Sequence, residues 1–172
     1  GFRDSMQDVL GVMHALAPKA KERIKTLLGI QASNGNARSV YFPATKKSEG
    51  GGRSDDHIWS IFSVCTYIRE TGDYDFLDEM VPYDNDMSIA QPMLDHLKVS
   101  FYRIVNNLGP HGLPLAMRAD WNDCINLSCY SDTPGESFQT YTNPKFAAEG
   151  GYSKVAESVF VATLFTYAGP NY

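Results

Sequence analysis

The chain has 172 residues, 43% of them hydrophobic and 12% aromatic, which is ample for the core of an ordinary globular domain. Its formal net charge of -5 argues against a nucleic-acid-binding surface. No apolar run approaches the roughly 18 to 20 residues of a membrane span, and no stretch reads as a signal peptide, so we expect a soluble, cytoplasmic protein.

Two helices are expected near the N-terminus. Ser5 with Asp8 three residues later resembles a capping box, and apolar residues follow at helical spacing, so the first helix is predicted over about residues 5–16. Pro18 then starts a second helix, whose apolar residues up to Ile30 form its buried face.

A long, polar, glycine-rich connection follows over residues 32–53, and a loop of this length in a compact domain is often functional. Residues 54–56 then offer N-caps for a helix whose apolar residues leave little polar surface. We expect this helix to be buried on more than one side, with Trp59 in the core, and to end at Gly72 in a left-handed conformation.

The remaining elements are also predicted to be helical. A short helix is expected near residues 74–79, a longer one over residues 88–107 with Pro92 in its first turn, and a last one over residues 153–167. No segment alternates polar and apolar residues over the length of a strand, so the chain is predicted to be all-α.

The cysteines do not indicate a metal site or a disulfide framework. Cys65, Cys124 and Cys129 make an odd count, with no close pair and no histidine at ligand spacing, so we expect reduced thiols and no metal. Cys124 lies beside Asp123, but no histidine base is nearby, which favours packing over a nucleophilic role.

The richest set of reactive side chains lies in residues 113–124, directly after the turn-rich run 109–112. An aromatic ring such as Trp121 can stack on a sugar, and a carboxylic acid such as Asp120 or Asp123 can protonate a glycosidic oxygen. These residue types are typical of a carbohydrate site. The alternative from the residues alone is that an aspartate caps a helix and the indole fills the core.

Several segments along the chain carry a family resemblance; they are residues 1–8, 109–115, 118–127, 135–139 and 156–160. In this order and spacing they resemble the catalytic domain of cellobiose phosphorylase, in the family that also holds chitobiose and cellodextrin phosphorylases. The resemblance implies an (α/α)6 barrel. Residues 1–172 would be a single segment of that barrel, incomplete at both ends.

The resemblance also implies a reaction, which is the reversible, inverting phosphorolysis of a β-1,4-linked disaccharide. For cellobiose the products are α-glucose 1-phosphate and glucose, with inorganic phosphate as co-substrate and no cofactor. Asp123 is implied as the general acid and Trp121 as a sugar contact. Arg3 and Asp4 are implied as the pair that holds the nonreducing-end sugar. A homodimer is expected for the full-length protein, because family members are commonly dimers.

The chemistry of these residue types agrees with a phosphorylase. An inverting hydrolase needs two carboxylates about 6.5 to 9.5 Å apart, one as acid and one to activate water. Phosphate is already an anion, so a phosphorylase needs only the acid, here Asp123. This carboxyl group must be protonated when it acts, which requires burial or a neighbouring negative charge to raise its pKa.

Other interpretations stay open at this point. The substrate could be chitobiose or a cellodextrin, or the enzyme could be an inverting hydrolase with Asp4 or Asp56 as base. A third alternative is a non-catalytic sugar-binding or structural segment, in which Asp4 caps the first helix. His111 is assigned to a turn, and Glu136 and Glu157 receive no role. The implied phosphate-binding groups lie outside the chain, so we expect this segment alone to be inactive.

Overall fold

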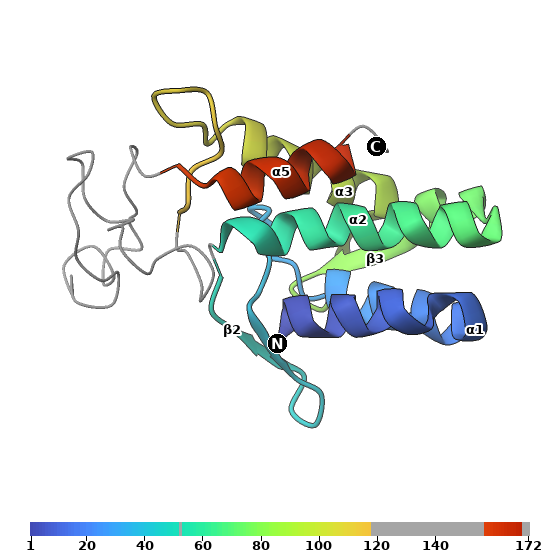
Figure 1. The fold of residues 1–172 in the computed structure, drawn as a ribbon. Coiled ribbons are helices and arrows are strands. Elements are labelled where there is room, and N and C mark those ends of the chain that lie inside the picture. The colour runs from blue at the N-terminus through green and yellow to red at the C-terminus, as the bar shows by residue number, and fades with distance from the viewer. Residues whose placement is uncertain (52, 118–156, 170–172) are drawn as a thin grey trace.

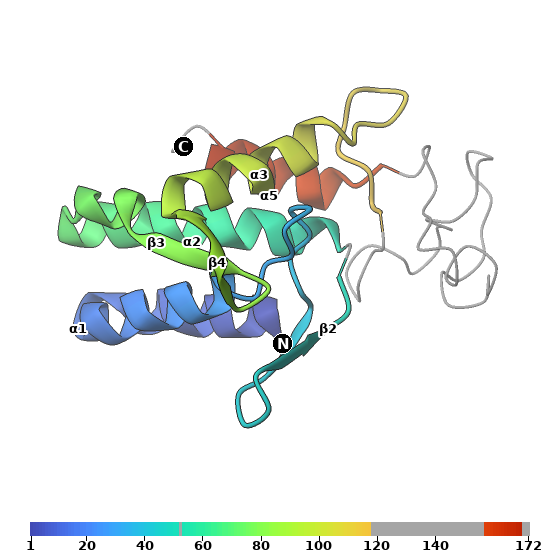
Figure 2. The ribbon, with the colours of Figure 1, turned by 180° about the vertical axis from the view of Figure 1, so that it is seen from behind.

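The computed structural model describes residues 1–51, 53–117 and 157–169. The α-helices within these residues are α1 (Phe2–Leu28), α2 (Ser54–Thr71), α3 (Met93–Val105) and α5 (Val159–Ala168), and a short 3-10 helix, η1 (Tyr74–Asp78), follows α2. Figures 1 and 2 show α2 in the middle, with α1 on one side and α3 and α5 on the other. In Figure 1, α1, α2 and α5 begin at the same end of the molecule, and α3 runs the opposite way.

The core is built around α2, whose apolar side chains are buried against the helices on both sides. Burial of this many large apolar side chains is the main favourable term in folding. The buried apolar residues of α2 are Ile58, Trp59, Ile61, Val64, Cys65, Tyr67 and Ile68. The predictions that this helix is buried on more than one side and that Trp59 belongs to the core are therefore confirmed.

Gly72 ends α2 in the left-handed conformation, with φ 70° and ψ 11°, as the sequence predicts. Its backbone N–H donates to the carbonyl of Ile68 at 2.8 Å. A Cβ atom added at Gly72 would meet no atom within 4 Å, so a substitution there isolates the cost of the backbone conformation.

We therefore expect Gly72→Ala to lower the free energy of unfolding by about 1 kcal/mol, measured by urea denaturation. Gly11→Ala is the matched control, because Gly11 lies inside α1 and an added Cβ also meets nothing within 4 Å. There the change should stabilise by about 0.5 to 1 kcal/mol, since alanine is the better helix former. Equal effects of the same sign at both glycines would contradict this explanation.

Two β-hairpins correct the all-α prediction. β1 (Val40–Phe42) pairs antiparallel with β2 (Lys47–Glu49), inside the connection predicted to lack strands. β3 (Met80–Tyr83) pairs antiparallel with β4 (Asp86–Pro92). Every side chain of β1, β2 and β4 is at least partly exposed, so these strands lack the buried face that would produce an alternation of apolar and polar residues.

The β3–β4 turn explains why the helix predicted over residues 88–107 is too long. Asp84 and Asn85 both have positive φ, 51° and 60°, which is the backbone of a two-residue hairpin turn. Residues 88–92 consequently belong to β4, and Pro92 precedes α3 instead of lying in its first turn. The Asp-Asn dipeptide was the sequence signal for this hairpin.

The two helices predicted near the N-terminus are both present, joined as α1 across a kink at Leu16. Leu16 leaves helical geometry, with φ -132° and ψ 40°, just before Pro18, which cannot donate a backbone hydrogen bond, so the first helix ends there. The second half of α1 folds back along the first, because Ser5 and Arg23, about 27 Å apart on a straight helix, are hydrogen-bonded. The predicted capping box is wrong, because α1 begins at Phe2 and Ser5 lies inside it. The Ser5 hydroxyl instead accepts a hydrogen bond from the Arg23 guanidinium at 3.0 Å.

The last helix begins later than predicted. Ser158 is its N-cap, and the hydroxyl oxygen accepts a hydrogen bond from the backbone N–H of Val161 at 3.1 Å. Residues 153–156, predicted as its first turn, lie outside the described residues. Across residues 1–51, 53–117 and 157–169, none of the helices combines the length and the apolar character needed to cross a membrane.

Candidate functional site

The first turns of α1 and α2 meet in a buried charged cluster, which we call the Arg3 cluster: Arg3, Ser39, Asp55 and Asp56. The Arg3 Nη1 atom donates to Asp55 Oδ2 at 3.2 Å, and both side chains are nearly enclosed. The Ser39 hydroxyl donates to Asp56 Oδ2 at 3.2 Å. Asp55 and Asp56 lie within the first turn of α2, and neither side chain caps that helix.

The electrostatics of the cluster centre on Asp56, which is 1% exposed. Burial, and then the negative charge of neighbouring Asp55, raise the pKa of the Asp56 carboxyl to about 7, against smaller opposing effects of Arg53, Ser39 and Arg3. Near neutral pH this carboxyl is therefore partly protonated. The cluster then carries less negative charge than two adjacent aspartates would suggest.

Asp4 is the exposed member of the pair predicted to hold a sugar. Its side chain is 64% exposed, and its Oδ1 atom lies 3.8 Å from Arg3 Nε. Arg3, by contrast, is only 8% exposed. Asp4 lies in the first turn of α1, which has no side-chain cap, so Asp4 does not act as the helix cap that the alternative proposed. It presents a hydrogen-bond acceptor to solvent beside the buried guanidinium.

The segment that leads toward the predicted acid is attached to the first turn of α2. Met117 forms an isolated antiparallel bridge with Arg53. One residue earlier, the carbonyl of Ala116 accepts a hydrogen bond from the buried hydroxyl of Ser54 at 3.1 Å. Met117 also has a positive φ of 52°, which is uncommon for a residue with a side chain. The described segment thus ends at Met117, beside the first turn of α2 and the Arg3 cluster.

Glu157 holds the turn before this segment. Its carboxylate accepts hydrogen bonds from the backbone N–H of His111 at 2.8 Å, from His111 Nδ1 at 2.6 Å and from the N–H of Leu113 at 3.1 Å. Although burial acts to raise it, these hydrogen bonds hold the pKa of the Glu157 carboxyl below its usual range. Glu157, which received no role from sequence patterns, therefore anchors the turn at residues 111–113.

Asp120, Trp121 and Asp123 lie outside the described residues, as does Glu136. Their roles therefore stay predictions. The structure brings Arg3 and Asp4 together with two aspartates of α2 and with the segment ending at Met117. In the part of the chain that the structure describes, no three histidine, cysteine, aspartate or glutamate side chains are grouped to hold a metal ion.

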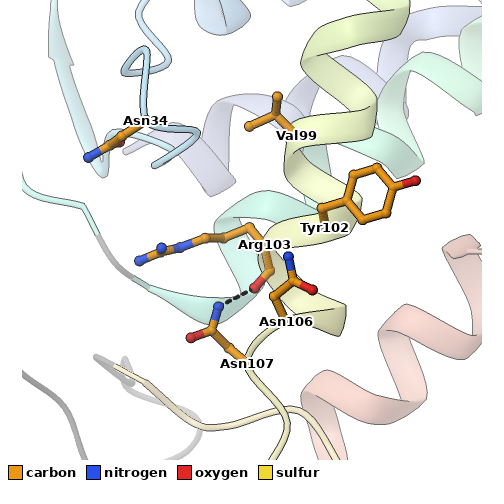
Figure 3. A pocket seen from close by; sticks show the side chains of 6 residues that line it. All are labelled: Asn34, Val99, Tyr102, Arg103, Asn106 and Asn107. Carbon is orange, nitrogen blue, oxygen red and sulfur yellow. Dashed lines mark hydrogen bonds between the residues drawn. The ribbon is translucent and has the colours of Figure 1, made fainter.

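A separate polar pocket of about 250 Å³ lies between α3 and the loop that follows α1. Figure 3 shows the Arg103 side chain extending from α3 to the side of the pocket where Asn34 lies. Its lining residues are Asn34, Val99, Tyr102, Arg103, Asn106 and Asn107. None of them is a residue predicted for the sugar site.

Comparison with protein families gives the class of this chain. The matching family is described as "Glycosyl hydrolase 94 superfamily, catalytic domain", and its model covers residues 1–172. The chain belongs to this family. The resemblance to the disaccharide phosphorylase family is therefore confirmed at family level.

Curated relatives include two disaccharide phosphorylases. The chain is 30% identical over 152 residues to N,N'-diacetylchitobiose phosphorylase of Vibrio proteolyticus, covering 74% of this chain and 19% of that protein. It is 36% identical over 126 residues to solabiose phosphorylase of Paenibacillus borealis, covering 73% and 16%. A cyclic beta-(1,2)-glucan synthase of Rhizobium meliloti is 27% identical over 146 residues, covering 73% and 5%. The chain thus spans less than a fifth of these relatives, and their names differ in the saccharide.

Proposed function

We propose that the protein containing this chain catalyses the reversible, inverting phosphorolysis of a β-linked disaccharide on an (α/α)6-barrel catalytic domain. The observation that carries this proposal is the match of the whole chain, residues 1–172, to the catalytic domain of the family. The names of two relatives, which are disaccharide phosphorylases, support the reaction class. The first half of α1 runs parallel to α2 and α5, while its second half and α3 run the opposite way, which is compatible with part of such a barrel (Figure 1).

In the proposed mechanism, Asp123 donates a proton to the glycosidic oxygen as the bond from that oxygen to the anomeric carbon breaks. A phosphate oxygen attacks the anomeric carbon from the opposite face, so a β-linkage gives an α-sugar 1-phosphate. Trp121 stacks on a sugar ring, and Arg3 and Asp4 bind hydroxyls of the nonreducing-end sugar. Phosphate is a co-substrate held by residues outside this chain, and no cofactor takes part.

The exposed carboxylate of Asp4 supports its role as a hydroxyl acceptor, since such a group must be reached by substrate. The alternative of an inverting hydrolase needs a second carboxylate to activate water. Asp56 suits that role poorly, because it is 1% exposed and bonded to Ser39. Of the two aspartates considered as the base of a hydrolase, Asp4 is therefore the one that remains.

We propose cellobiose as the disaccharide, and chitobiose or a cellodextrin as the alternatives. This choice rests on the resemblance of the sequence, because the curated relatives act on different saccharides by name. We further propose a homodimeric, cytoplasmic full-length protein. These proposals are independent of the reaction class.

The full-length protein should be incubated with cellobiose, N,N'-diacetylchitobiose and cellotriose, each with and without inorganic phosphate. We expect turnover only with phosphate, and fastest with cellobiose. Faster turnover of another sugar would change the substrate and leave the reaction class standing. Sugar release that is indifferent to phosphate would establish the hydrolase, and binding without turnover would favour a non-catalytic role.

A further inference from the structure

Arg3 is held by a residue that neither the resemblance nor the local sequence assigns to the site. Its guanidinium donates to Asp55 at 3.2 Å, across 52 residues of sequence. A buried ion pair is weak evidence for stability, because the cost of removing two charges from water offsets much of their attraction. Its clearest effect is geometric, since it fixes the start of α1 against the start of α2.

A second tie joins the same two helix ends through Ser39. The backbone carbonyl of Ser39 accepts a hydrogen bond from the N–H of Phe2 at 2.8 Å, while its hydroxyl donates to Asp56 at 3.2 Å. Gly50, with φ 71°, packs closely on this serine, because an added Cβ would lie 3.1 Å from the Ser39 Cβ atom. Asp56, in the first turn of α2, therefore holds Ser39, and Ser39 in turn holds the backbone N–H of Phe2.

We propose that Asp55 and Asp56 are positioning residues for the Arg3–Asp4 pair. Asp55 acts through the Arg3 guanidinium, and Asp56 acts through Ser39 on the backbone at Phe2. Together they set where the exposed Asp4 carboxylate points. This inference rests on the proposed function for the role of Asp4. Its physical basis is that a sugar-binding group must be held within about 0.5 Å of its productive position by the residues around it.

The test is a double-variant cycle in the full-length protein with Arg3→Gln, Asp55→Asn and both together. We expect Asp55→Asn to lower kcat/KM for phosphate-dependent disaccharide turnover by about 10- to 100-fold. The double variant should be no worse than Arg3→Gln alone, since Asp55 acts through Arg3. If the double variant instead lost kcat/KM by the product of the two single losses, Asp55 would act independently of Arg3 and the proposal would be overturned.

Asp73→Asn is the matched control. Asp73 accepts a hydrogen bond from the Lys21 ammonium at 2.7 Å, so it ties α1 to the chain beyond α2, away from the site. This variant should lower the unfolding midpoint without changing kcat/KM. If Asp55→Asn and Asp73→Asn lowered kcat/KM equally at equal loss of stability, Asp55 would be merely structural.

Amide hydrogen exchange of residues 1–6 without substrate gives a second readout. Asp55→Asn should speed exchange there, and Asp73→Asn should leave it unchanged. If the wild-type protein showed no phosphate-dependent turnover, the proposed function would fail, and the exchange comparison would still decide whether Asp55 positions the start of α1. Unchanged exchange in Asp55→Asn would overturn the inference.

Discussion

Asp123→Asn is expected to lower kcat for phosphorolysis of a natural disaccharide by about 10²- to 10⁴-fold in the full-length protein. The leaving sugar oxygen is a poor leaving group unless it receives a proton as the bond breaks. Asparagine has nearly the shape of aspartic acid but has no acidic proton to give. The measurement is steady-state kinetics with saturating phosphate.

Asp120→Asn is the matched control, because Asp120 lies three residues away and is not the proposed acid. Its effect should be much smaller. An aryl glycoside whose leaving group needs no proton should restore much of the phosphate-dependent turnover of Asp123→Asn. Normal turnover of disaccharide by Asp123→Asn would refute the assignment, and loss of activity only in Asp120→Asn would move the acid to that residue.

The second large effect is expected from Asp56→Asn, which should raise the free energy of unfolding at pH 8 by on the order of a few kcal/mol. Burial and the charge of Asp55 raise the pKa of Asp56 from 3.8 to about 7 in the folded state. Between these values the folded protein keeps a proton that the unfolded chain has released. Stability therefore falls as the pH rises from about 4 to 7, and the whole loss is present above pH 7.

Asparagine removes this loss because it is neutral at every pH, and its amide oxygen can still accept the Ser39 hydrogen bond. Urea denaturation of wild type and variant should give similar stabilities near pH 4 and a growing advantage of the variant up to pH 8. All other titrating groups are common to the two proteins, so their contributions cancel in the difference between the two free energies of unfolding. A difference that does not change with pH would show that the Asp56 pKa is not raised by folding.

Local patterns predict the part of this fold that depends on neighbouring residues. Apolar residues at helical spacing identify α2 and place Trp59 in the core, and a glycine after the last helical turn identifies the end at Gly72. The same reasoning misses β3 and β4, because the exposed side chains of β4 show no alternation of apolar and polar residues beside the turn signal at Asp84 and Asn85. It also misplaces the start of α1, which is set by Ser39 far along the chain.

In the candidate site, too, residues that can be predicted from the sequence stand beside residues that only the fold brings together. The family resemblance predicts the adjacent pair Arg3 and Asp4, but no local pattern identifies Asp55, whose position favours a helix cap. The partners are 52 residues apart, and only the packing of α1 on α2 brings them together. Glu157 likewise meets His111 across 46 residues. No spacing rule connects residues so distant.

The stereochemistry of the first product tests the central claim most directly. The full-length protein should be followed by ¹H NMR during turnover of a β-linked disaccharide in phosphate buffer. Inverting phosphorolysis predicts that the α-anomer of a sugar 1-phosphate appears first, in equal amount to the released sugar. A β-sugar 1-phosphate, or two free sugars with no sugar phosphate, would contradict the account.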